Sequence, residues 1–177
     1  MLKKIGQIFF LVLLLSGVAI VQFSFIFPLP TIYSQINLAA IVLVFTLFFF
    51  DFRSALYASL ILGFWLDLYS FNFFGFYLFL FFFTILLANW ILKTWLTNRS
   101  LYSFLLLILL AALAYNLFSG FLSYFSGTSS GGFFLWRASF WSNLFYGALW
   151  SELAGLLMFS LAGALTRRFQ PFFLEKK

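Results

Sequence analysis

Six long apolar runs, separated by short connections, constrain this chain more than any other feature of its sequence. They cover residues 5–27, 36–52, 54–69, 76–92, 100–125 and 139–165. A helix needs roughly 20 apolar residues to cross the hydrocarbon core of a bilayer, where each backbone polar group must be paired within the membrane. The runs therefore predict an all-α polytopic membrane protein with six transmembrane helices in a compact bundle.

The composition supports lipid as the solvent. Of 177 residues, 65% are hydrophobic and 8% are charged, whereas a soluble domain carries about 25% charged residues. None of the connections is long enough for a second domain, so we expect residues 1–177 to form a single membrane domain. Lys3 and Lys4 precede the first run as in a signal peptide. That run is long, however, and no A-x-A site follows it, which favours an uncleaved first span.

The basic residues predict the orientation of the helices, because cytoplasmic loops carry an excess of Lys and Arg. If the N-terminus is inside, Arg137 is the basic residue that falls outside. The inner side then receives Lys3, Lys4, Arg53, Lys93, Arg99, Arg167, Arg168, Lys176 and Lys177. We therefore expect a multi-pass protein of the cytoplasmic (plasma) membrane with both termini in the cytoplasm. The basic tail, residues 167–177, is either an interfacial anchor on membrane lipid or an ordinary stop-transfer flank.

The sequence offers little catalytic chemistry. It has no Cys and no His, which removes disulfides, thiolates, the usual nitrogen and sulfur ligands of zinc, and the commonest general base. No nucleophile or phosphate-binding motif is present. The formal net charge of +6 does not indicate nucleic acid, because the basic residues lie in small clusters between apolar spans. We expect no catalytic, metal or cofactor site, and therefore no enzyme.

Asp67 is an acidic residue in the otherwise apolar stretch 62–76, near the outer end of the third predicted span. One role is to accept hydrogen bonds from unpaired backbone N–H groups in the following loop or at the start of a neighbouring helix. The alternative is proton transfer or ligand binding, because acidic residues within membranes often carry function. We favour the first role.

Small residues recur at every fourth position in three of the runs. Such stripes allow close approach of helix backbones, which is the main source of packing between helices in lipid. The stripes predict a tightly packed bundle. They consist of Ala55, Ser59, Gly63 and Asp67; of Ala112, Asn116 and Gly120; and of Asn143, Gly147, Ser151 and Gly155.

Glu152 lies about midway along the last run, where no basic residue is expected at the same depth. We therefore expect it to be protonated and hydrogen-bonded to a neighbouring helix, with Asn116 as a candidate partner. The alternative is a contact with a polar group of a partner protein's helix.

One motif resembles a known family. Gly63, Asp67, Leu68, Ser70 and Gly75 form the pattern G-x-x-x-D-L-x-S-x-x-x-x-G. A proline-containing segment, residues 28–45, precedes it, and the stretch RASFWSNLFYGALW, residues 137–150, begins the last helix. Together with the length and the order of the spans, these features resemble MreD, the rod shape-determining membrane protein of bacteria.

The resemblance implies a non-catalytic scaffold of the cell-shape and lateral cell-wall elongation machinery. Its partners would be an MreC-like protein, an MreB-like cytoskeleton, RodA and a penicillin-binding transpeptidase. It also implies a six-helix fold like that of the substrate-binding subunits of energy-coupling-factor transporters. A vitamin or small-molecule uptake subunit is therefore the alternative function, with an outward pocket near Asp67, Asn72 and the first outer loop. The first span lacks the Ala-x-x-x-Ala stripe of that class, which favours the scaffold.

Overall fold

The computed structural model describes residues 2–30, 34–70, 72–96, 100–125 and 138–166, and these residues are organised as helices. The helices are α1 (Leu2–Val21), continued by the π-helical turn η1 (Gln22–Ile26), then α2 (Leu38–Phe49), α3 (Phe52–Tyr69), α4 (Phe76–Thr94), α5 (Leu101–Phe125) and α6 (Ala138–Thr166). Arg99, Arg137 and the predicted basic tail, residues 167–177, lie outside the described residues.

Each predicted apolar run is helical, and most of its ends agree with the structure to within two or three residues. The second run is the main correction, because α2 already ends at Phe49. Phe50 and Asp51 leave the helical conformation, and α3 begins at Phe52. Phe52 and Arg53 are therefore both in α3, whereas the apolar runs place Phe52 in the second helix and Arg53 between the second and third helices. Three of the described helices are long and apolar enough to cross a membrane, namely Phe76–Thr94, Leu101–Phe125 and Phe140–Leu161.

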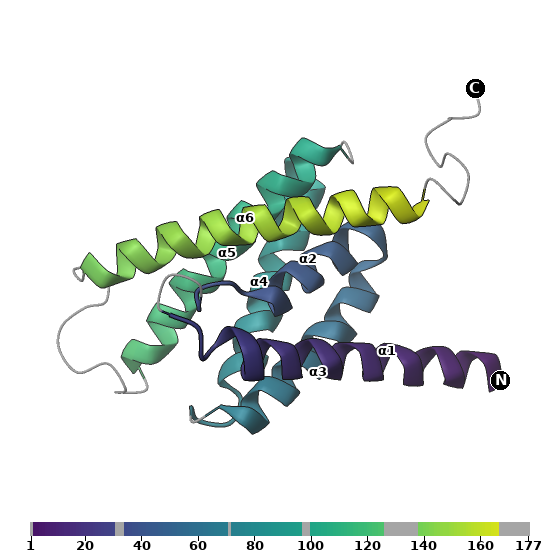
Figure 1. Ribbon diagram of the computed structural model, residues 1–177, viewed down its shortest axis with the longest axis horizontal. Coiled ribbons are helices and arrows are strands. Elements are labelled where there is room, and N and C mark those ends of the chain that lie inside the picture. The colour runs from purple at the N-terminus through teal and green to yellow at the C-terminus, as the bar shows by residue number, and fades with distance from the viewer. Residues whose placement is uncertain (1, 31–33, 71, 97–99, 126–137, 167–177) are drawn as a thin grey trace.

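The helix α2 forms the centre of the bundle. Most of its side chains are buried, and it contacts α1, α3, α4, α5 and α6. In Figure 1, α2 lies between α6 above it and α1 below it. The start of α1 and the end of α6 point toward the same end of the molecule.

The length of α2 sets the internal shape of the bundle. Its 12 residues rise only about 18 Å at ~1.5 Å per residue, well short of the roughly 30 Å hydrocarbon core. Because α2 is short, the non-helical residues 34–37 that precede it lie beside the helices that surround α2. At the other end of α2, Phe48 and Phe49 pack with Phe104 of α5 and Phe159 of α6. These rings hold the last helix against the centre.

Candidate functional site

Asp67 joins the end of α3 to the beginning of α4. Its side chain is only 4% exposed. One carboxylate oxygen accepts hydrogen bonds from the backbone N–H groups of Gly75 at 3.1 Å and Leu78 at 3.2 Å. The other accepts from the N–H of Tyr77 at 2.8 Å. The structure thus confirms the prediction that this acid bonds to unpaired backbone groups at a neighbouring helix start.

These bonds complete the hydrogen bonding of the first turn of α4. The first N–H groups of a helix have no partner within it. Here the N–H of Phe76 donates to the carbonyl of Phe73, and the helical pattern begins when Phe79 donates to Gly75. Gly75 has φ +99, a left-handed conformation that favours glycine. Because Gly75 has no side chain to cap the helix, Asp67 supplies the cap from α3.

Gly63 allows α3 and α4 to approach closely enough for this arrangement. A Cβ atom at Gly63 would lie 2.6 Å from the Cα atom of Leu78, whose N–H Asp67 binds. Ala55 and Ser59, earlier in the same stripe, are fully buried. The predicted small-residue stripe of α3 therefore faces protein, as expected. Ser70 ends α3, and its hydroxyl donates a long bond of 3.4 Å to the Asp67 carbonyl.

The stripe of α6 faces the bundle in the same way. Gly147, Ser151 and Gly155 are buried, whereas Asn143 is half-buried. Gly147, Ser151 and Gly155 are the buried residues among residues 140–161 of this helix. Gly155 lies against the Ile108 side chain of α5. A single line of small residues thus provides the deepest contacts of α6.

The predicted hydrogen bond between Glu152 and Asn116 is absent from the described residues. The Asn116 side-chain nitrogen instead donates to the Ala112 carbonyl of its own helix at 2.8 Å and lies beside Gly147. Glu152 follows Ser151 on the helix, and its carboxyl lies against the backbone of Leu109. The contact with a neighbouring helix is thus present, since Leu109 belongs to α5. Only the candidate partner Asn116 was wrong, because depth along a helix does not fix the direction of a side chain. Gly120, the last member of the α5 stripe, is half-buried.

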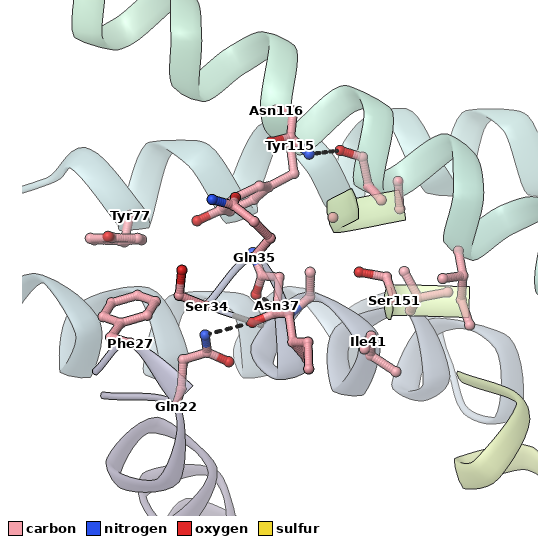
Figure 2. A pocket seen from close by; sticks show the side chains of 17 residues that line it. Gln22, Phe27, Ser34, Gln35, Asn37, Ile41, Tyr77, Tyr115, Asn116 and Ser151 are labelled. Atoms are coloured by element: carbon pink, nitrogen blue, oxygen red, sulfur yellow. Dashed lines mark hydrogen bonds between the residues drawn. The ribbon is translucent and has the colours of Figure 1, made fainter. Parts of the chain in front are cut away.

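A cavity of about 140 Å³ lies at the N-terminal end of α2. Residues of η1, of the segment before α2, and of α4, α5 and α6 line it, including Gln22, Asn37, Tyr77, Tyr115 and Ser151. Figure 2 shows these polar side chains around the space. Tyr77, whose backbone N–H donates to Asp67, and Ser151, in the small-residue stripe of α6, both line this cavity.

Sequence reasoning missed Gln22, which holds one wall of this cavity. Its side chain is 2% exposed. Its nitrogen donates to the Ile36 carbonyl at 2.9 Å, and its oxygen accepts from the Leu38 N–H at 2.8 Å. Asn37 caps α2 by accepting from Ala40. The available signal was a single amide residue near the end of an apolar run.

A second, wider groove lies at the opposite end of α2. It is lined by Asp51 and Arg53 at the start of α3 and by Asn89 and Lys93 near the end of α4. Lys93 also lies 5.8 Å from the centre of the Phe52 ring. Arg53 at the start of α3 and Lys93 near the end of α4 therefore line the same groove.

Comparisons of the chain with protein-family models, with curated proteins and with solved structures found no match.

Proposed function

We propose that this chain is a non-catalytic membrane scaffold of the MreD kind, acting in the bacterial machinery that elongates the lateral cell wall. The observation that carries the proposal is the hydrogen bonding of the Asp67 carboxylate. Among the described residues, the Asp67 carboxylate accepts hydrogen bonds from the backbone N–H groups of Gly75, Tyr77 and Leu78. Gly63, Asp67 and Gly75, which carry the resemblance, thus cooperate in joining two helices. A motif used for architecture fits a scaffold better than a reaction.

The scaffold would span the membrane six times with both termini in the cytoplasm, as one domain. The directions of α1 and α6, whose terminal ends lie on the same side, support an even number of spans (Figure 1). The groove that contains Arg53 and Lys93 would then face the cytoplasm, in keeping with the positive-inside rule. The cavity at the other end of α2 would face outward.

The exposed surface of α6 supports a docking role. Apart from its small-residue stripe, this helix presents large apolar side chains, among them Trp141, Phe145, Leu157 and Leu161. In a bilayer such a surface is available to lipid and to the helices of other membrane proteins. An MreC-like protein and RodA are the membrane partners that the resemblance implies.

The cavity is the observation that favours the second candidate, a small-molecule uptake subunit. It lies next to the segment between α1 and α2, where that function predicts a pocket. Asp67 does not line it, although Tyr77 does. The described part of α1 also offers no Ala-x-x-x-Ala stripe. We therefore place the uptake function second.

Affinity purification from native membranes tests the proposal. A tagged full-length chain, solubilised in mild detergent, is expected to recover an MreC-like protein, identified by mass spectrometry. The Gly17→Ala variant is the matched control, because a Cβ atom there meets nothing within 4 Å, and it should recover the same partner. Recovery of transporter ATPases with their membrane coupling subunit, and of no MreC-like protein, would instead support the uptake function.

A further inference from the structure

The groove at the C-terminal end of α2 carries two cations without an anionic partner. Arg53 at the start of α3 and Lys93 near the end of α4 line it, and both side chains are exposed. Within the described part of the chain, neither side chain forms an ion pair. Asp51 also lines the groove, so two positive charges stand against one negative charge. The lining therefore has an excess of positive charge, which is complementary to an anion.

The Lys93 ammonium group lies beside the first residues of α3. It is 5.8 Å from the centre of the Phe52 ring, and Phe52 directly precedes Arg53. Asn89 is one turn before Lys93 on α4 and lines the same groove, and side chains at this spacing share a face of the helix. The Asn89 amide is half-buried and forms no hydrogen bond with the described residues. The groove thus offers free hydrogen-bond donors from both helices.

These donors suit a phosphate group. A guanidinium group can bind phosphate oxygens in a bidentate manner, and an ammonium group binds them as a point charge. The NH₂ group of Asn89 can donate to a further phosphate oxygen. The Asp51 carboxylate repels a phosphate, so it lowers the affinity that the two cations would otherwise give.

The rest of the wall is apolar. The groove has a volume of about 700 Å³, within the range of roughly 300–1,000 Å³ of pockets that hold small-molecule ligands. A soluble anion such as phosphate would leave the apolar wall in water, whereas a hydrocarbon chain would cover it. A ligand with both a phosphate and a hydrocarbon chain therefore fits best. The apolar lining consists of Leu47, Phe50, Phe52, Leu92 and Leu96.

Two tryptophans indicate that this end of the bundle lies at the membrane surface. Trp90 and Trp95, near the end of α4, are exposed, and their ring centres are 6.2 Å apart. Trp is enriched at membrane–water interfaces. In the orientation proposed above, the groove faces the cytoplasm, and the cytoplasmic leaflet contains anionic lipids.

We propose that this groove binds an anionic phospholipid of the cytoplasmic leaflet, with its phosphate at Arg53, Lys93 and Asn89. One acyl chain lies against Phe50 and Leu96. Such binding goes beyond the docking of partner proteins, and it does not depend on the scaffold function.

Native mass spectrometry of the purified full-length protein, titrated in neutral detergent with phosphatidylglycerol or phosphatidylcholine, tests the proposal. The two lipids have the same acyl chains, but the first has a net negative charge and the second is zwitterionic. Phosphatidylglycerol is expected to bind at least about fivefold more tightly, since one basic residue near an anionic lipid contributes roughly this factor.

Substitutions of the charged residues should change phosphatidylglycerol binding in opposite directions. Arg53→Gln and Lys93→Gln should each weaken it by about fivefold, and the double variant should lose the preference for phosphatidylglycerol. Asp51→Asn should strengthen it by a similar factor, because this substitution also changes the charge of the groove by one unit.

Thr94→Val is the matched control beside Lys93. Thr94 is exposed, and its hydroxyl donates to the Trp90 carbonyl of its own helix, so this variant should bind phosphatidylglycerol like the parent. Circular dichroism and gel filtration establish that each variant is folded. Equal affinity of the folded parent for the two lipids, equal phosphatidylglycerol affinity of the double variant and Thr94→Val, or weaker binding by Asp51→Asn would overturn the proposal.

Soluble anions provide the remaining arm of the experiment. Inorganic phosphate and an oligoglutamate peptide, each added at the lipid concentration and at constant ionic strength, should leave phosphatidylglycerol bound. Displacement of the lipid by either one would assign the groove to a soluble anion and would likewise overturn the proposal.

Discussion

Replacing Asp67 by leucine is expected to lower the free energy of unfolding by about 3–5 kcal/mol, because each buried N–H group left without a partner costs roughly 1–3 kcal/mol. The variant would leave the N–H groups of Gly75, Tyr77 and Leu78 unpaired at the start of α4. Thermal unfolding in detergent micelles, followed by circular dichroism, measures the loss.

Asp67→Asn should give an intermediate result. An amide has one acceptor oxygen, so its NH₂ group would have to face at least one of the three N–H donors. A loss of about 1–3 kcal/mol is expected. Asp51→Leu is the control, because Asp51 directly precedes the same helix, is exposed and makes no side-chain cap. If Asp67→Leu unfolds at the same temperature as Asp51→Leu, the carboxylate does not hold α4.

Gly63→Ala is expected to separate α3 from α4. The added methyl group would lie 2.6 Å from the Leu78 Cα atom and 3.2 Å from the Tyr77 carbonyl oxygen. Both are backbone atoms, which cannot move aside as a side-chain end can. A loss of about 1–3 kcal/mol follows from overpacking of this kind. The shift would also lengthen the Asp67 bonds, so thermal stability should fall markedly.

Gly17→Ala provides the matched comparison for that substitution. It makes the same chemical change within a helix, but nothing lies within 4 Å of the added atom. Alanine is favoured over glycine in a helix interior by about 1 kcal/mol. The variant should therefore be at least as stable as the parent. A similar melting temperature for Gly63→Ala and Gly17→Ala would show that the close approach of α3 and α4 contributes nothing.

The positions of the helices could be predicted because apolar runs of this length have few alternatives in lipid. The role of Asp67 could be predicted for a related reason. A lone acid near a helix end, followed by a loop and another helix, has unpaired N–H groups close by in sequence. Gly63 followed from its place one turn before Asp67. Each of these inferences uses interactions between residues that are near one another along the chain.

The cavity could not be predicted in the same way, because residues far apart in the sequence form it. Gln22 binds residues 36 and 38, and Ser151 lies opposite α2. The incorrect pairing of Glu152 with Asn116 has the same origin, since the rotation of α6 relative to α5 decides which side chains meet. The end of α2 at Phe49 could not be predicted from the apolar pattern either, because Phe50 is as apolar as the residues of the helix before it.

Depletion of the chain in its native cell tests most directly whether it works by assembling the elongation machinery. The account predicts that depleted cells lose their rod shape and become round, and that expression of the parent chain or of Gly17→Ala restores the rods. Cells that keep their shape but stop growing until a small nutrient is supplied would contradict it.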